Sequence, residues 1–219
     1  MLILTALYVL GLVLLFLTNQ KKSRLRYYPP AKLFSSMLFI AIAISCASYS
    51  GNWGLFMLLL PALILCLLGD VSLAFYKKNS NRYYLLAGMF FFLLAHFAFV
   101  YSLSKIQPFT WTDFIFPVFI TLLTAIVNRS PDINVGKLKP ATLIYAFAVA
   151  AFCWKGLHIM ITIPSTSAIL LGSGALAFFI SDTMLYFCFF CKKNFKGQGG
   201  IALLLYYMAI MAIALSIRF

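Results

Sequence analysis

Apolar segments of about 20 residues recur along the whole chain, and each is long enough to cross a hydrocarbon core of ~30 Å. Of the 219 residues, 64% are hydrophobic and only 10% are charged, whereas a soluble domain carries roughly 25% charged residues. The pattern predicts an all-α polytopic membrane bundle with no room for a separate soluble domain. We therefore expect a single integral membrane domain over residues 1–219.

The basic residues support a count of eight spans, because they alternate from one loop to the next. Of the 17 Lys and Arg residues, 14 fall on one side, and the other side receives only Lys105, Lys155 and Arg218. The positive-inside rule then makes the basic loops cytoplasmic and both termini extracytoplasmic. The predicted spans cover approximately residues 2–18, 31–50, 54–76, 83–104, 112–128, 139–155, 165–190 and 198–217. Residues 156–164 are interpreted as either a loop or a short re-entrant turn.

The net charge of +13 could indicate nucleic-acid binding, but the charges lie in short loops between spans. This distribution is typical of membrane topology, so we expect the lipid bilayer as partner and no nucleic acid. The compact loops favour the inner membrane of a bacterium, with the endoplasmic reticulum membrane as the alternative.

Two aspartates lie in matched apolar surroundings inside the third and seventh spans. Asp70 and Asp182 both begin an Asp-x-x-Leu-x-Phe pattern, and both lie 18 residues before a glycine. Small residues at steps of four accompany each of them, so both should face other helices and not lipid. A carboxylate at membrane depth costs several kcal/mol unless it is paired or protonated, which makes the pair a candidate site. The likeness indicates a parallel duplication of four spans.

The chemistry that such a pair supports is acid–base catalysis. Two buried carboxyl groups that share a site separate in proton affinity, so one can donate a proton while the other holds a water. His96, in the fourth span, is predicted to lie deeper and could also point inward. Two alternatives remain open: structural hydrogen bonds between helices, and a proton or ion site of a transporter.

A metal site is poorly supported, and no cofactor is expected. The chain has two histidines, predicted on different segments, whereas a catalytic zinc site usually needs three protein ligands. The Cys188-x-x-Cys191 pair lacks a second pair to complete a tetrahedral site.

The remaining ionisable residues near the ends of the spans are interpreted as peripheral. Asp113 and Asp132 are expected at the surface and solvated, and Lys155 is expected at the end of the sixth span. His158 is expected at the interface, in an extracytoplasmic turn.

Several short motifs, in order and at similar spacing, resemble the YhhN family of membrane proteins, which includes the lysoplasmalogenases. The residues that carry the resemblance are Gly69-Asp70, Leu73, Gly88, Ala95-His96, Gly174-Ala175 and Ser181-Asp182. One departure is visible: the family often has a tyrosine three residues after the histidine, where this chain has Phe99.

The resemblance implies hydrolysis of the vinyl-ether bond of a lysoplasmalogen. The products would be a fatty aldehyde and glycerophosphoethanolamine or glycerophosphocholine. Asp70 and Asp182 are then the candidate catalytic residues, without an assignment of which is the acid. The alternatives are a proton-coupled transporter and a lipid-binding membrane protein that uses the same aspartates. The candidate substrate-binding residues for a lysophospholipid are His96, Ser181, Tyr207 and Lys32. The oligomeric state is left open.

Overall fold

The computed structural model describes residues 2–20 and 22–219, and these residues form eight α-helices with two short 3-10 turns. The helices are α1 (Leu2–Gln20), α2 (Tyr28–Ser50), α3 (Trp53–Asn79), α4 (Arg82–Ile106), α5 (Thr112–Val127), α6 (Lys139–Thr162), α7 (Thr166–Phe190) and α8 (Gln198–Ser216). Their ends agree with the predicted spans to within three residues at every boundary but one. The all-α prediction and the count of eight helices are confirmed.

Seven of these helices are long and apolar enough to cross a membrane, and the exception is α5. Its 16 residues cover about 24 Å at 1.5 Å per residue, less than the ~30 Å of a hydrocarbon core. The chain is therefore an integral membrane protein with seven candidate spans and one shorter apolar helix. The extracytoplasmic position of both termini stays a prediction.

The one boundary that differs is the end of α6, predicted at residue 155 and found at Thr162. The Lys155-Gly156 pair was interpreted as a helix end, and both residues are instead buried inside the helix. Gly156 lies where α6 packs against α7: a Cβ at this position would come within 2.6 Å of the Ala175 Cβ. Gly156 thus allows α6 to pack closely on α7, and most of the predicted loop at residues 156–164 is helical.

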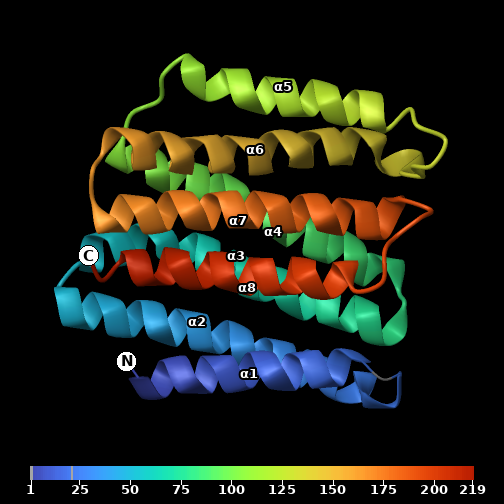
Figure 1. Ribbon diagram of the computed structural model, residues 1–219, viewed down its shortest axis with the longest axis horizontal. Helices are drawn as coiled ribbons and strands as arrows, with labels where there is room; N and C mark the ends of the chain where they lie inside the picture. Colours follow the sequence, from blue (N-terminus) through green and yellow to red (C-terminus); the bar gives the residue numbers. More distant parts are fainter. Residues whose placement is uncertain (1, 21) are drawn as a thin grey trace. The chain divides into compact units, whose positions relative to one another are not determined.

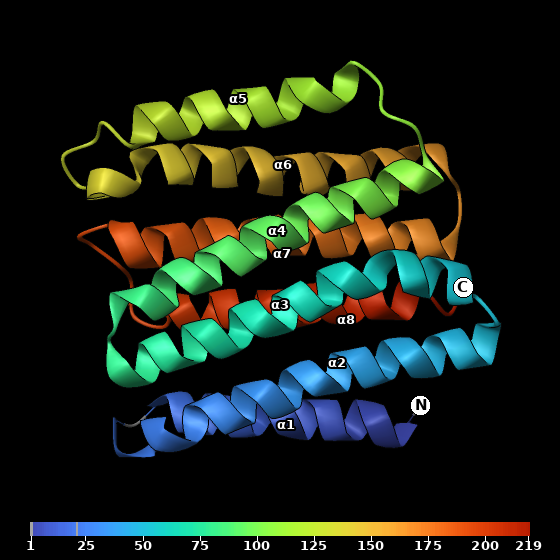
Figure 2. The same ribbon diagram turned by 180° about the vertical axis from the view of Figure 1, so that it is seen from behind.

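The chain packs as two compact units, and the first covers Met1–Ala98 and Ile217–Phe219. Its helices α1, α2 and α3 follow one another as neighbours (Figure 2). The first part of α4 crosses α3 where two glycines leave space. A Cβ on Gly69 would lie 2.7 Å from the Phe92 ring, and one on Gly88 would lie 2.6 Å from Leu73. This close crossing holds α3 against α4 at the residue next to Asp70.

The second unit covers Phe99–Ser216. Figure 1 shows its helices α5, α6, α7 and α8 side by side in chain order. Three buried rings form part of its core: Phe99 stacks on Phe152 at 4.6 Å between ring centroids, and Phe178 meets both edge-on. The end of α4 thus joins the second unit through Phe99.

Candidate functional site

Asp70, on α3, is buried and bound by two side chains from α2. The Lys32 ammonium lies 2.9 Å from Oδ1, and the Ser36 hydroxyl donates a hydrogen bond of 2.6 Å to Oδ2. Lys32 and Ser36 are one helical turn apart, so one face of α2 supplies both partners. An ammonium and a hydroxyl donor stabilise the charged form of a carboxyl group. Asp70 is therefore held as one half of a buried ion pair.

Two tyrosines extend this polar region of the first unit. Tyr8, from α1, and Tyr28, from the first turn of α2, are both buried and interact electrostatically with Asp70. The Lys77 ammonium lies 4.9 Å from the centroid of the Tyr28 ring. Helices α1, α2 and α3 therefore contribute polar groups around one carboxylate.

Asp182, on α7, is also buried, as predicted from the small residues around it. Its Oδ2 accepts a hydrogen bond of 2.6 Å from the Tyr145 hydroxyl of α6. The phenol is a neutral donor, whereas the ammonium beside Asp70 carries a full charge. Each aspartate thus has a partner on the preceding helix of its own unit, and the two partners differ in chemistry.

The four candidate substrate-binding residues are all buried. Lys32 pairs with Asp70 of α3. The Ser181 hydroxyl donates to the Ala202 carbonyl of α8 at 2.8 Å, which joins α7 to α8. Tyr207 packs edge-on against Tyr206, and His96 lies one helical turn after Phe92 on α4.

Sequence reasoning missed Tyr145 and Ser36, because one hydroxyl in an apolar helix is an ordinary residue. The internal likeness offered a signal for Tyr145. It lies 37 residues before Asp182, and Lys32 lies 38 residues before Asp70. Had the likeness been extended to the preceding helix, it would have pointed to within one residue of Tyr145. No comparable signal marks Ser36.

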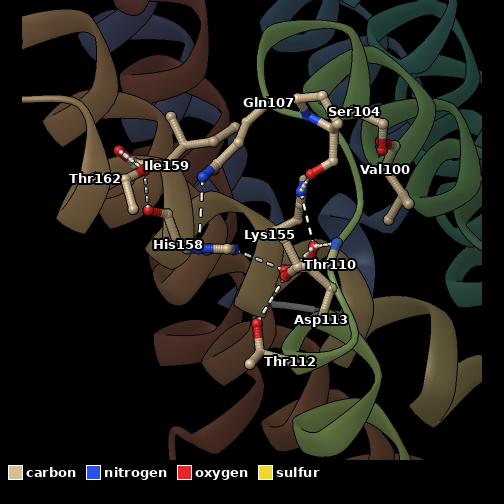
Figure 3. A network of polar contacts seen from close by, with 11 residues as sticks. Val100, Ser104, Gln107, Thr110, Thr112, Asp113, Lys155, His158, Ile159 and Thr162 are labelled. Carbon is tan, nitrogen blue, oxygen red and sulfur yellow. Dashed lines mark hydrogen bonds and ion pairs between the residues drawn. The ribbon is translucent and has the colours of Figure 1, made fainter.

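A second buried charge cluster lies in the second unit, where α5 begins and α6 approaches its end (Figure 3). Asp113 Oδ2 lies 2.8 Å from the Lys155 ammonium, and Asp113 Oδ1 lies 2.8 Å from His158 Nδ1. Lys155 also donates to the Pro108 carbonyl at 2.8 Å. The Thr110 amide donates to Asp113 Oδ2 at 2.8 Å.

This cluster overturns the prediction that Asp113 is solvated, since its side chain is 1% exposed. It also places Lys155 and His158 within α6, not at its end and in a turn beyond it. The physical reason is mutual neutralisation: a buried lysine is tolerated when a carboxylate and a carbonyl satisfy it. Asp132, by contrast, is exposed as predicted.

The cluster also explains how α5 can be short. Lys155 lies seven residues before the end of α6, which is about 10 Å along the helix. Because Asp113 is in the first turn of α5 and pairs with Lys155, α5 begins at the level of Lys155 and not at the level of the end of α6. The non-helical backbone before it has its Pro108 carbonyl bonded to Lys155 and its Thr110 amide bonded to Asp113. Irregular backbone at membrane depth is tolerated where protein groups satisfy it in this way.

The residues present give little support for a metal centre. Within residues 2–20 and 22–219, no three His, Cys, Asp or Glu side chains gather in a way that could hold an ion. The carboxylates and their hydroxyl and ammonium partners are instead suited to proton transfer and to orienting a water molecule.

Comparison with known proteins assigns the chain to a family. Searches of the curated proteins and of the solved structures found no match. The sequence model of the YhhN family matches residues 27–217, which include both aspartates, their partners on α2 and α6, and the second charge cluster. The chain belongs to the YhhN family of integral membrane proteins.

Proposed function

We propose that this protein hydrolyses the vinyl-ether bond of a lysophospholipid, as a lysoplasmalogenase does. Membership of the YhhN family, which includes lysoplasmalogenases, supports the reaction class. The observation that carries the mechanism is the different partnering of the two aspartates. Vinyl-ether hydrolysis needs one group that donates a proton and a second that acts as an anion, and Asp70 is held as an anion by Lys32.

In this mechanism Asp182 protonates the β-carbon of the vinyl ether, which turns the ether into an oxocarbenium ion. The Tyr145 hydroxyl donates to Oδ2, which leaves Oδ1 as the oxygen assigned to the proton transfer in this proposal. The proton moves from a carboxylic acid to carbon, and Asp182 becomes a carboxylate. General acid catalysis of this kind contributes roughly 10²–10⁴-fold to a rate.

Asp70 orients the water that captures the cation and accepts its proton. Ser36 and Lys32 fix both oxygens of the carboxylate, which keeps its orientation constant. The hemiacetal formed by water addition then breaks its C–O bond to the glycerol oxygen. The hemiacetal hydroxyl gives up its proton as the departing glycerol oxygen gains one, so the products are a fatty aldehyde and the glycerophospho alcohol. The proton that Asp70 took from water passes to solvent and Asp182 regains one from solvent, which returns the protein to its starting state.

The test is aldehyde release by detergent-purified protein given lysoplasmenylethanolamine, with Asp70→Asn and Asp182→Asn run alongside. Asp132→Asn is the matched control, because it makes the same chemical change at an exposed loop position. We expect aldehyde from the wild type and from the control only. Full activity in both buried variants, or no aldehyde from folded wild type, would contradict the proposal.

A proton-coupled carrier is the second candidate, and the Asp113–Lys155–His158 cluster favours it. Buried ionisable groups inside membrane proteins often mark proton or ion pathways, and hydrolysis makes no use of this cluster. Proton flux into vesicles that contain the purified protein, without consumption of lipid, would support the carrier. Proton flux that persists in Asp113→Asn would show that the cluster does not carry the protons, which would contradict the carrier hypothesis.

A further inference from the structure

Two basic loops of the second unit are joined to each other at the ends of α5, α6, α7 and α8 (Figure 1). We call residues 128–139 and 191–197 together the basic double loop. Ile133 and Cys191 form an antiparallel bridge. The Asn134 amide donates to the Phe190 carbonyl at 2.8 Å, and the Lys192 amide donates to the Asp132 carbonyl at 2.9 Å. These bonds hold two segments, far apart in the sequence, as one structure.

The basic double loop carries six exposed cationic side chains, from Arg129, Lys137, Lys139, Lys192, Lys193 and Lys196. Asp132 is its one carboxylate, which leaves a net charge of +5. The Lys192 ammonium donates to the Pro131 carbonyl at 2.6 Å, so one of the cations belongs to the connection itself. The other five cationic side chains are exposed on a backbone that is held in place by these bonds.

An aromatic side chain accompanies these charges. Phe195 lies between Lys193 and Lys196 in the sequence and is 57% exposed. Aromatic residues beside cations are typical of the region where lipid headgroups meet the hydrocarbon core. A soluble anionic partner would offer no apolar layer to receive an exposed phenylalanine at the end of a membrane helix.

We propose that the basic double loop is a binding site for the phosphodiester headgroups of anionic phospholipids. Lysine and arginine make charge-assisted hydrogen bonds to phosphate oxygens, and several cations beside a bilayer select anionic over zwitterionic lipid. Phe195 inserts at the level of the headgroups. This proposal does not rest on the catalytic one, because it uses a different set of residues.

The connection between the loops distinguishes this site from the other basic loops of the chain. The turn between α3 and α4 also bears exposed cations, Lys78 and Arg82, but only Ser80 and Asn81 separate its two helices. If charge alone attracted anionic lipid, both loops would contribute equally. The proposal instead assigns selective binding to the joined pair.

The experiment titrates the detergent-purified full-length protein with phosphatidylglycerol and, separately, with phosphatidylcholine, and counts retained lipids by native mass spectrometry. The test variant is Lys193→Gln/Lys196→Gln, which leaves the Lys192 connection intact. The matched control, Lys78→Gln/Arg82→Gln, removes two exposed cations elsewhere. We expect phosphatidylglycerol affinity to fall about thirtyfold in the test variant, as the loss of two cations from the headgroup site implies, and to change little in the control.

A second variant, Asn134→Pro, keeps all six cations but removes the amide that bonds to Phe190. We expect it to lose the preference for phosphatidylglycerol while retaining the thermal unfolding temperature of the helices. Equal losses in the test and control pairs would overturn the proposal in favour of nonspecific charge. Displacement of the lipid by millimolar inorganic phosphate would overturn it in favour of a free-phosphate site.

Discussion

Asp70 and Asp182 occupy similar places in the two units but are held by different chemistry. Each lies on a helix whose preceding neighbour supplies a partner, from Lys32 at a separation of 38 residues and from Tyr145 at 37. The Lys32 partner is a cation, and Ser36 binds the second oxygen of the same carboxylate. The Tyr145 partner is a neutral phenol.

The comparison teaches how two similar pairs of helices can surround a carboxylate with different chemistry. The residue before each aspartate is small in both units, and both small residues face the next helix. Gly69 admits the Phe92 ring of α4, whereas Ser181 bonds to the Ala202 carbonyl of α8. Two different contacts thus join each aspartate-bearing helix to the next helix, while the partner on the preceding helix sets the charge around the carboxylate.

The largest expected effect separates the two roles by chemical rescue. Asp70→Asn and Asp182→Asn should each lower turnover by roughly 10²–10⁴-fold. Azide, a strong nucleophile, can capture an oxocarbenium ion without help from a base. It should therefore restore substrate consumption to Asp70→Asn but not to Asp182→Asn.

Consumption is followed by mass spectrometry of the lysolipid and of any azide adduct. Rescue of Asp182→Asn alone would reverse the assignment of the two aspartates. Rescue of neither variant would show that Asp70 does not act by activating water.

The next prediction compares the two buried ion pairs, Lys32–Asp70 and Lys155–Asp113. Removing one partner leaves an uncompensated buried charge and typically costs about 3–5 kcal/mol. Lys32→Met and Lys155→Met should therefore both be strongly destabilised. Neutralising the partner as well, with Asp70→Asn or Asp113→Asn, should recover most of that loss, because paired replacement is often neutral.

Function then distinguishes the pairs. The double variant at Lys155 and Asp113 should recover hydrolysis together with stability, and the double variant at Lys32 and Asp70 should recover stability alone. Thermal unfolding in detergent and aldehyde release measure the two quantities. An inactive but stable double variant at Lys155 and Asp113 would instead give that cluster a direct functional role.

Much of the fold was predictable, because long apolar runs and alternating basic loops determine helix number and ends in a membrane protein. The exception at residue 155 has a physical cause. A lysine followed by a glycine indicates a helix end only when the lysine has no buried partner. Asp113 is 42 residues away in the sequence, and local pattern contains no information on such a contact.

The candidate site was predictable in part. The cost of a carboxylate in an apolar run was enough to single out Asp70 and Asp182, and both are buried. Lys32 was predicted as a substrate-binding residue and not as the partner of Asp70. Its pairing with Asp70 depends on the register between α2 and α3, which the apolar pattern of either helix leaves undetermined.

The α3–α4 crossing gives a smaller expected effect. Gly69→Ala would place a methyl group 2.7 Å from the Phe92 ring, and overpacking of this kind costs typically 1–3 kcal/mol. Gly54→Ala is the control, since its Cβ would meet nothing within 4 Å and alanine favours the helix by up to ~1 kcal/mol. Thermal unfolding should move in opposite directions, and a neutral Gly69→Ala would mean that the crossing relaxes easily.

The smallest expected effect belongs to Ser181, the counterpart of Gly69. Ser181→Ala removes the bond to the Ala202 carbonyl, which is worth about 1 kcal/mol, and leaves turnover within a few-fold of wild type. Ser181→Gly should cost more stability than Ser181→Ala, because glycine in a helix interior adds up to ~1 kcal/mol. Steady-state kinetics decide between structural and substrate-binding roles. A large rise in KM at unchanged stability would show that Ser181 contacts the lysolipid, as its resemblance to the family motif first implied, and that its bond to α8 is not its main role.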